Sequence, residues 1–211
     1  LMPQMIAVWA EELGHEVHYV TYTGFENLLD LLPHDLDIIF VSTFTHAALT
    51  AYGLANIFRQ RGVVTVLGGP HARSYAADAK NYFDYILGLT DKELLSRLLE
   101  DFSPQPGEGI FLSASQQPRS LPGVKQRWKF IQHNLKKTRF IQAVSMIGSL
   151  GCPYACSFCI DAKMDYQPLP YDQIREDLVF LAGLPKPPIV GWYDPNFGVR
   201  FNDYLNIIES A

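Results

Sequence analysis

Two short and almost uninterrupted apolar runs constrain the fold of this chain more than any other feature. They are LDIIFVST at 36–43 and VVTVLGG at 63–69, and a related run, FDYILG, follows at 83–88. Runs of this length without polar alternation are typical of parallel strands that are buried on both faces. Helical patterns at 46–61 and 91–101 follow the first and third runs. We therefore expect βαβ units in an α/β fold with an open, parallel, Rossmann-like sheet.

The segments before the first run continue this alternation. Residues 4–13 have the amphipathic pattern of a helix that ends at Gly14. Residues 15–22 predict a strand, and residues 25–32 predict a short helix. Further along the chain, Asp91 stands where it can cap the helix that it begins.

Composition excludes several classes of protein. The 211 residues are 48% hydrophobic and 18% charged, which is unlike a disordered chain. The net charge of -5 argues against a nucleic-acid-binding surface. No apolar run reaches the roughly 18 residues of a membrane helix, and no basic stretch followed by an apolar segment suggests a signal peptide. We expect a cytoplasmic protein that has neither nucleic acid nor a membrane as its partner.

Polar and glycine-rich segments follow two of the predicted strands. In open α/β sheets, ligands bind at the carboxyl ends of the strands. The first candidate segment supplies hydroxyl groups, and the second permits close backbone approach. The residues are Ser42, Thr43, Gly68, Gly69, Pro70 and His71. The alternative interpretation is that both segments are simply tight turns between strand and helix. No GxGxxG pattern is present, so a dinucleotide site is not expected.

The order of these segments resembles the cobalamin-binding domains that are attached to radical S-adenosylmethionine (SAM) enzymes. The resemblance rests on GHEV at 14–17, STFT at 42–45, GGPHA at 68–72 and FDYILG at 83–88. It covers residues 1–101 and implies a cobalamin contacted by Ser42, Thr43 and the turn Gly68-Gly69-Pro70-His71. Domains of this family usually begin with one further strand, so we expect the first strand to be missing here.

Histidine ligation of cobalt is not expected. The chain has no DxHxxG motif, by which many cobalamin domains supply a histidine to cobalt. His46 and His71 lie at strand ends, but a histidine there is more often a residue that bonds the turn or the backbone.

Proline and glycine interrupt the pattern over residues 102–139, which predicts a linker with some local structure. Residues 124–139 are helical in pattern and locally basic. The basic residues are Lys125, Arg127, Lys129, Lys136, Lys137 and Arg139. We expect them to form a solvated helix face that packs through Trp128 and Phe130.

All the cysteines of the chain lie on one short segment. Cys152, Cys156 and Cys159 form a CxxxCxxC pattern directly after a strand predicted at 140–148. Thiolates are soft ligands that bind zinc and iron–sulfur clusters. Three of them can hold three irons of a 4Fe-4S cluster, leaving one iron without a protein ligand. A structural zinc site would need a fourth ligand, such as Asp161 or a distant histidine, and a ferredoxin would normally supply four cysteines.

The CxxxCxxC motif with an aromatic residue, Phe158, before the last cysteine is similar to the signature of the radical SAM superfamily. The resemblance implies that Cys152, Cys156 and Cys159 bind a 4Fe-4S cluster and that Phe158 lies near the adenine of SAM. The open iron would bind SAM, and one electron would release a 5′-deoxyadenosyl radical. A reductant such as flavodoxin or ferredoxin would be a partner.

The segments after the cysteines predict a helix at 171–182, closed by Gly183, and a second strand at 187–194. This alternation fits the first βα units of a partial (β/α)6 TIM-like barrel. The strand ends in a D-x-N-F pattern similar to that of the family, which implies that Asp194 and Asn196 contact SAM. The alternative is a turn in which these side chains bond their own backbone.

The combined interpretation is a fragment of a cobalamin-dependent radical SAM enzyme. Its parts are a cobalamin-binding-like domain at 1–101, a linker at 102–139 and the N-terminal part of the barrel at 140–211. The implied reaction is methyl transfer to an unactivated carbon of a small-molecule substrate that the sequence does not identify. The alternatives are a radical SAM enzyme that does not use cobalamin and a non-enzymatic metal-binding module. With so few barrel units, the fragment itself is expected to be inactive.

Overall fold

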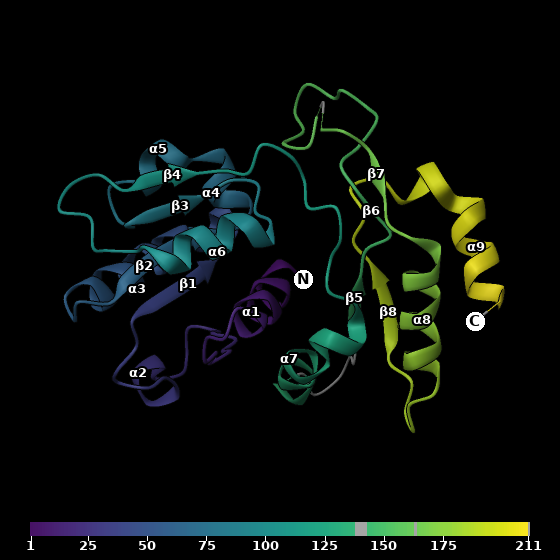
Figure 1. Ribbon diagram of the computed structural model, residues 1–211, viewed down its shortest axis with the longest axis horizontal. Coiled ribbons are helices and arrows are strands. Elements are labelled where there is room, and N and C mark those ends of the chain that lie inside the picture. Colours follow the sequence, from purple (N-terminus) through teal and green to yellow (C-terminus); the bar gives the residue numbers. More distant parts are fainter. Residues whose placement is uncertain (138–142, 163, 211) are drawn as a thin grey trace. The chain divides into compact units, whose positions relative to one another are not determined.

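The computed structural model describes residues 1–137, 143–162 and 164–210 (Figure 1). The chain divides into two compact units. We call Met2 with Trp9–Pro118 the sheet unit, and Leu1, Pro3–Val8 and Arg119–Ala211 the cysteine unit. Each unit is described by itself below.

The sheet unit contains a four-stranded, fully parallel sheet. The strands are β1 (Ile38–Ser42), β2 (Val64–Gly68), β3 (Tyr85–Leu87) and β4 (Ile110–Leu112), in the order β1-β2-β3-β4. The three apolar runs of the sequence form β1, β2 and β3. The predicted α/β fold with a parallel sheet is therefore confirmed for this unit, and it is consistent with a Rossmann-like arrangement.

Helices pack on both faces of this sheet, which explains the continuous apolar runs. On one face, α3 (Ala48–Arg59), α4 (Pro70–Ser74) and α5 (Ala76–Ala79) pack against Leu67 and Ile86. On the other face, α6 (Lys92–Glu100) packs against Val66 and Leu87. Successive residues of a strand point to opposite faces of the sheet. The adjacent residues Val66 and Leu67 of β2, and Ile86 and Leu87 of β3, therefore pack into the cores on opposite faces.

The remaining helices of this unit begin and end close to the predicted positions. They are α1 (Met2–Glu12), whose Pro3–Val8 segment groups with the cysteine unit, α2 (Leu28–Leu31), a 3-10 turn at Thr45–Ala47 and α6 (Lys92–Glu100). The predicted cap of α6 is confirmed, because the Asp91 carboxylate accepts a hydrogen bond from the Leu94 N–H at 2.8 Å.

Two sequence expectations for this unit are wrong. Residues 15–22 form no strand. Val20 and Tyr22 instead pack beside α2 and α3, and no described strand pairs with this segment. An extended segment needs a neighbouring backbone to complete its hydrogen bonds. Conversely, residues 110–112, expected in the linker, form β4 because the edge of β3 supplies that partner.

The cysteine unit contains one parallel βαβ unit. Strand β5 (Ala143–Met146) pairs with β8 (Ile189–Trp192), and α8 (Tyr171–Ala182) connects them. A 3-10 turn at Phe197–Arg200 and α9 (Phe201–Ser210) follow. Residues 138–142, which include the start of the predicted strand 140–148, lie outside the described residues.

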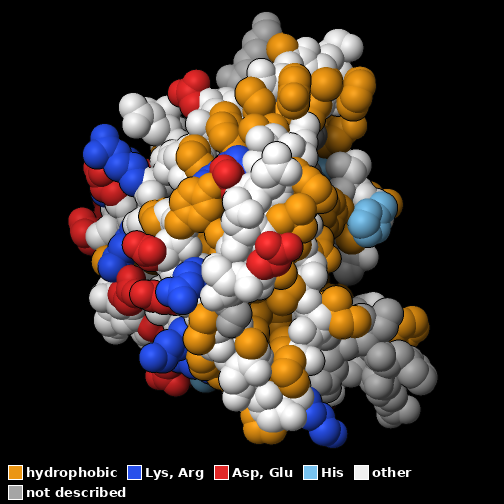
Figure 2. Space-filling model, turned by 90° about the vertical axis from the view of Figure 1, so that its right-hand side faces the viewer, with side chains coloured by type: hydrophobic (Ala, Val, Ile, Leu, Met, Phe, Trp, Pro, Cys, Tyr) orange, Lys and Arg blue, Asp and Glu red, His pale blue; other side chains and the backbone are white. Residues whose placement is uncertain are grey.

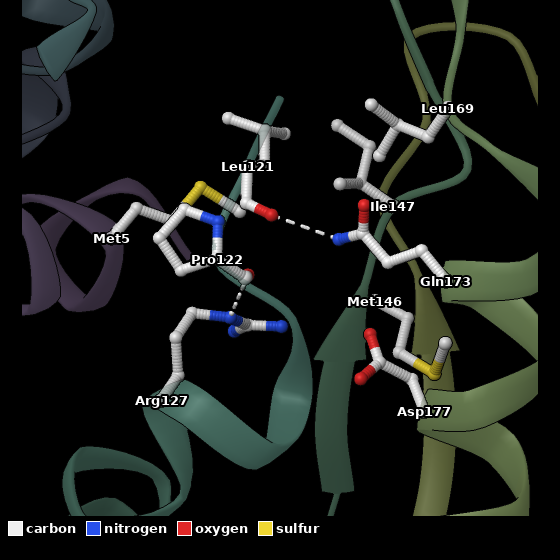
Figure 3. Close-up of a pocket in the computed structure, with 9 residues that line it drawn as sticks. All are labelled: Met5, Leu121, Pro122, Arg127, Met146, Ile147, Leu169, Gln173 and Asp177. Atoms are coloured by element: carbon white, nitrogen blue, oxygen red, sulfur yellow. Dashed lines mark hydrogen bonds between the residues drawn. The ribbon is translucent and has the colours of Figure 1, made fainter. Parts of the chain in front are cut away.

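Helix α7 (Val124–Lys137) forms where it is predicted, but its basic residues are not all solvated. Arg127 is 2% exposed. Its Nε donates to the Pro122 carbonyl at 3.0 Å and its guanidinium to Gln4 Oε1 at 2.8 Å. Figure 3 shows Arg127 beside a small cavity that is also lined by Gln173 and Asp177.

Large apolar side chains remain exposed on the two C-terminal helices. Figure 2 shows hydrophobic side chains gathered on the face that includes these helices. The exposed large apolar residues of α8 and α9 are Tyr171, Val179, Phe201, Leu205 and Ile208. In the described part of the chain, no helix combines the length and the apolar character that a membrane crossing requires.

Candidate functional site

The residues predicted at the sheet edge are brought together at the carboxyl ends of β1 and β2. Ser42 is in register with Gly68. The Thr43 N–H donates to the Gly68 carbonyl at 3.4 Å, and the His71 N–H donates to the Thr43 carbonyl at 3.2 Å. Pro70 begins α4, where its fixed φ suits the first helical turn. The segments that follow β1 and β2 therefore form one continuous edge.

Gly69 is required at this edge. Its φ is 89°, a conformation that side-chain-bearing residues rarely adopt. A Cβ atom placed there would lie 2.8 Å from Ser42 Oγ and 3.0 Å from the Thr43 carbonyl oxygen. Any larger residue would push the two turns apart. The exposed Ser42 and the partly exposed Gly68 and Gly69 leave hydroxyl and backbone groups accessible at this edge.

His71 is buried inside a chain of hydrogen bonds. Its Nε2 lies 2.7 Å from the Tyr52 hydroxyl, which itself donates to Asp78 Oδ2 at 2.7 Å. Burial, together with the bond to Asp78, raises the pKa of Tyr52, so this hydroxyl keeps its proton. The Tyr52 oxygen must then accept from His71 Nε2–H, which leaves Nδ1 to accept from Thr45 Oγ1 at 3.2 Å. We assign the tautomer from this network.

Both ring nitrogens of His71 are therefore hydrogen-bonded within the sheet unit. His46 is exposed and stacks on Phe44, with ring centroids 6.0 Å apart. Tyr52 and Asp78 had no sequence signal, because they approach His71 only in the folded sheet unit.

The three cysteines lie on a loop that is closed at its base. We call residues 151–166 the cysteine loop. Strand β6 (Ser149–Leu150) enters it, and β7 (Gln167–Pro168) leaves it as the antiparallel partner of β6. Within the loop, the Cys152 N–H donates to the Met164 carbonyl at 3.2 Å, and the Cys159 N–H to the Cys156 carbonyl at 3.1 Å.

None of the three thiols takes part in a disulfide. Cys152 is half-buried, whereas Cys156 and Cys159 are exposed. Phe158 is 91% exposed beside them. Among the residues that the structure describes, no three His, Cys, Asp or Glu side chains converge on a common metal position.

The donor set nevertheless fits an iron–sulfur cluster. Three unpaired thiols on one loop supply the soft ligands that iron requires. Because metal binding is coupled to folding in small sites, binding of a cluster would require the loop to bring the thiols together.

Asp194 follows β8 and accepts hydrogen bonds from the segment that leads into the cysteine loop. Its Oδ1 accepts hydrogen bonds from Ser149 Oγ at 2.6 Å and from the Tyr204 hydroxyl at 2.7 Å. Its Oδ2 accepts from the Gly148 N–H at 3.0 Å. Asn196 Oδ1 accepts from the Gly198 N–H at 3.1 Å and caps the 3-10 turn, as the turn interpretation expects. Ser149 and Tyr204 had no sequence signal, since the Asp194 network forms only when β6, the end of β8 and α9 come together.

Comparison with known proteins identifies one relative of part of the chain. Over 132 residues the chain is 28% identical to the bacteriochlorophyllide d C-8(2)-methyltransferase of Chlorobaculum tepidum. The match covers 60% of this chain and 28% of that protein, so the chain corresponds to little more than a quarter of the relative's length. No family model matches the chain.

Proposed function

We propose that this chain is part of a radical SAM enzyme that transfers a methyl group and uses a 4Fe-4S cluster, SAM and cobalamin. The observation that carries the proposal is the cysteine loop. Three unpaired thiols in a CxxxCxxC pattern follow a parallel strand, on a loop whose two ends are paired by β6 and β7. The similarity to a methyltransferase supports the class of reaction.

Within this proposal, the residues of the loop have distinct tasks. Cys152, Cys156 and Cys159 hold three irons, and the exposed ring of Phe158 is free to lie against the adenine of SAM. Held by these three thiolates, a 4Fe-4S cluster with one open iron would provide the electron for SAM cleavage. Asp194 and Asn196 line the end of the adjacent strand, at the edge where barrel enzymes place their active sites.

The edge of β1 and β2 is the proposed cobalamin site. Ser42, Thr43, Gly68 and the turn from Gly69 to His71 form one edge at the carboxyl ends of two parallel strands. This is where open α/β sheets bind ligands. His71 would hold the turn in place and not bind cobalt, because both of its ring nitrogens are bonded.

The proposal includes a small-molecule substrate, a reductant such as flavodoxin or ferredoxin, and a cytoplasmic location. It also places β5 and β8 as the first two strands of a (β/α)6 barrel. The parallel β5–β8 pair and its connecting α8 support this placement.

Anaerobic reconstitution of the 211-residue chain with iron and sulfide tests the cluster. We expect about four irons per chain and an EPR signal of the reduced cluster that changes when SAM is added. Cys152→Ala, Cys156→Ala and Cys159→Ala should each abolish this signal. Ser157→Ala, which alters an exposed loop residue between two ligands, should retain it. A signal that SAM does not change would contradict the open iron and would favour a metal-binding module.

Titration with hydroxocobalamin, followed by gel filtration and visible absorbance, tests the second cofactor. We expect a corrinoid band to elute with the chain. Gly69→Val should abolish the band, whereas Gly107→Val should not, because a Cβ at Gly107 meets no atom within 4 Å. If the parent chain retains no corrinoid, the radical SAM enzyme without cobalamin becomes the better description.

A further inference from the structure

Both ends of the cysteine loop are hydrogen-bonded to the segment that follows β8 in the cysteine unit. On the entering side, Gly148 donates its N–H to Asp194 and accepts a hydrogen bond at its carbonyl from the Leu169 N–H at 2.8 Å. On the leaving side, the Leu169 carbonyl accepts from the Arg200 guanidinium at 3.4 Å. The two ends also pair with each other through β6 and β7. The stem of the loop, which we define as residues 148–150 and 167–169, therefore depends on groups that lie far from it in the sequence.

Tyr204 of α9 holds the Asp194 carboxylate in this arrangement. The Tyr204 side chain is fully buried, and its ring stacks on Phe197 at 4.6 Å and on Trp192 at 5.0 Å between centroids. Burial raises the pKa of Tyr204, and the negative charge of Asp194 raises it further, so the hydroxyl remains a donor to Asp194 Oδ1. A hydrogen bond to a charged acceptor is stronger than one between neutral groups.

Gly148 makes this contact possible. A Cβ atom at Gly148 would lie 2.5 Å from both the ring and the hydroxyl of Tyr204. Three residues further on, Gly151 has a φ of 66° and turns the chain directly into Cys152. The path from Asp194 to the first cysteine is thus short, and most of it is buried.

We infer that Asp194 is a positioning residue for the cysteine loop, and that Tyr204 orients its carboxylate for this task. The inference rests on the proposed function, since it gives the loop its role as a cluster-binding segment. In this inference, the Asp194 carboxylate accepts hydrogen bonds from the Gly148 N–H and the Ser149 hydroxyl. These bonds fix the position of the chain that leads into Cys152. SAM is then not the group that Asp194 primarily binds.

Alkylation of Cys152 by iodoacetamide tests the inference without any cluster. In a Cys156→Ser, Cys159→Ser background, Tyr204→Phe keeps the stacked ring and removes only the hydroxyl. Because a hydrogen bond to a charged group is lost, we expect Cys152 to react about three- to tenfold faster. Tyr193→Phe, at an exposed ring beside Asp194, is the matched control and should leave the rate unchanged. The rate at Cys156, measured in a Cys152→Ser, Cys159→Ser background, should not respond to Tyr204→Phe.

An unchanged Cys152 rate in the folded Tyr204→Phe chain would overturn the inference. Equal acceleration of alkylation at Cys152 and Cys156 would also overturn the inference, because it would indicate that the whole cysteine loop had become more mobile. These outcomes can be read even if no cluster assembles, so failure of the proposed function is seen separately, in the iron content of the parent chain.

EPR of the reconstituted chain separates positioning from direct SAM binding. We expect Tyr204→Phe and Asp194→Asn to shift the signal of the reduced cluster before SAM is added, and Tyr193→Phe to leave it unchanged. A shift that is seen only after SAM is added would overturn the inference in favour of Asp194 as a SAM ligand.

Discussion

The carboxylate of Asp177, on α8, accepts a hydrogen bond from the Val124 N–H at the first turn of α7, with an oxygen–nitrogen distance of 2.7 Å. A side chain from one helix therefore satisfies a backbone donor that another helix leaves open at its N-terminus. Gly123 permits this approach, because a Cβ there would lie 2.8 Å from Asp177 Oδ1.

The burial of the Asp177 carboxylate predicts a specific pH dependence of stability. Burial raises the pKa of Asp177 above its ordinary value of 3.8 and outweighs the opposing effects of Val124 and Arg127. The folded state therefore binds the proton more tightly than the unfolded state, so the contribution of Asp177 is most favourable below pH 3.8 and is lost as the pH rises through the folded pKa. The stability of Asp177→Asn should therefore increase relative to that of the parent chain as the pH rises from 3 to 7. The expected increase is about 1.4 kcal/mol for each unit by which the pKa of Asp177 is raised.

Urea unfolding of the parent chain and Asp177→Asn across this pH range measures the difference. Glu209→Gln, at an exposed carboxylate of α9, is the control and should follow the parent. A difference between Asp177→Asn and the parent that does not change with pH would contradict the prediction.

Asp84 is a buried carboxylate just before β3 that accepts hydrogen bonds from β2 and from the segment after α6. It accepts from the Thr65 N–H at 2.8 Å, from the Thr65 hydroxyl at 2.7 Å and from the Gln105 N–H at 2.8 Å, and it pairs with Arg59 at 3.4 Å. Asp84→Ala leaves these donors and the Arg59 charge without a partner, so we expect a loss of about 3–5 kcal/mol. Native-state hydrogen exchange at Leu67 and Ile86 measures this loss, and the exposed Asp35→Ala should show none.

Tyr52 connects His71 to Asp78 in the sheet unit. Tyr52→Phe keeps the stacking on Tyr82, whose centroid is 4.0 Å away, but removes the hydroxyl between two polar groups. We expect a loss of about 1.5–3 kcal/mol in the same hydrogen-exchange measurement. Tyr75→Phe, at an exposed tyrosine that also stacks on His71, should cost far less. Nitrogen chemical shifts should show His71 as the Nε2–H tautomer in the parent chain, and an Nδ1–H tautomer there would contradict the proposed network.

The cap of α6 gives the simplest prediction. Asp91→Ala removes the acceptor for the Leu94 N–H and should destabilise the helix by about 1 kcal/mol. Asp101→Ala, at the opposite end of the same helix, should be neutral or slightly stabilising, because a negative charge there opposes the helix dipole. Amide exchange of Leu94 and Leu95 distinguishes the two, and equal effects of both substitutions would count against the cap.

Where the structural signal lies within one short segment, the sequence predicts it correctly. The runs that form β1, β2 and β3, the helices α3 and α6 and the Asp91 cap all follow from patterns a few residues long. The segment 15–22 has such a pattern and still forms no strand, because strand formation depends on a neighbour that the pattern does not contain.

The candidate site also combines features that follow from the local sequence with features that depend on contacts between distant segments. The CxxxCxxC spacing, its place after a predicted strand and the polar residues at the strand ends can all be read from the order of the residues. The folded chain is needed to show that Arg127 is buried against Gln4, that His71 bonds Tyr52 and Thr45, and that Asp194 bonds Ser149 and Tyr204. Spacing along the chain controls local hydrogen bonds and ligand count. Burial, and the partner that each buried polar group must then find, depends on which distant segments pack together.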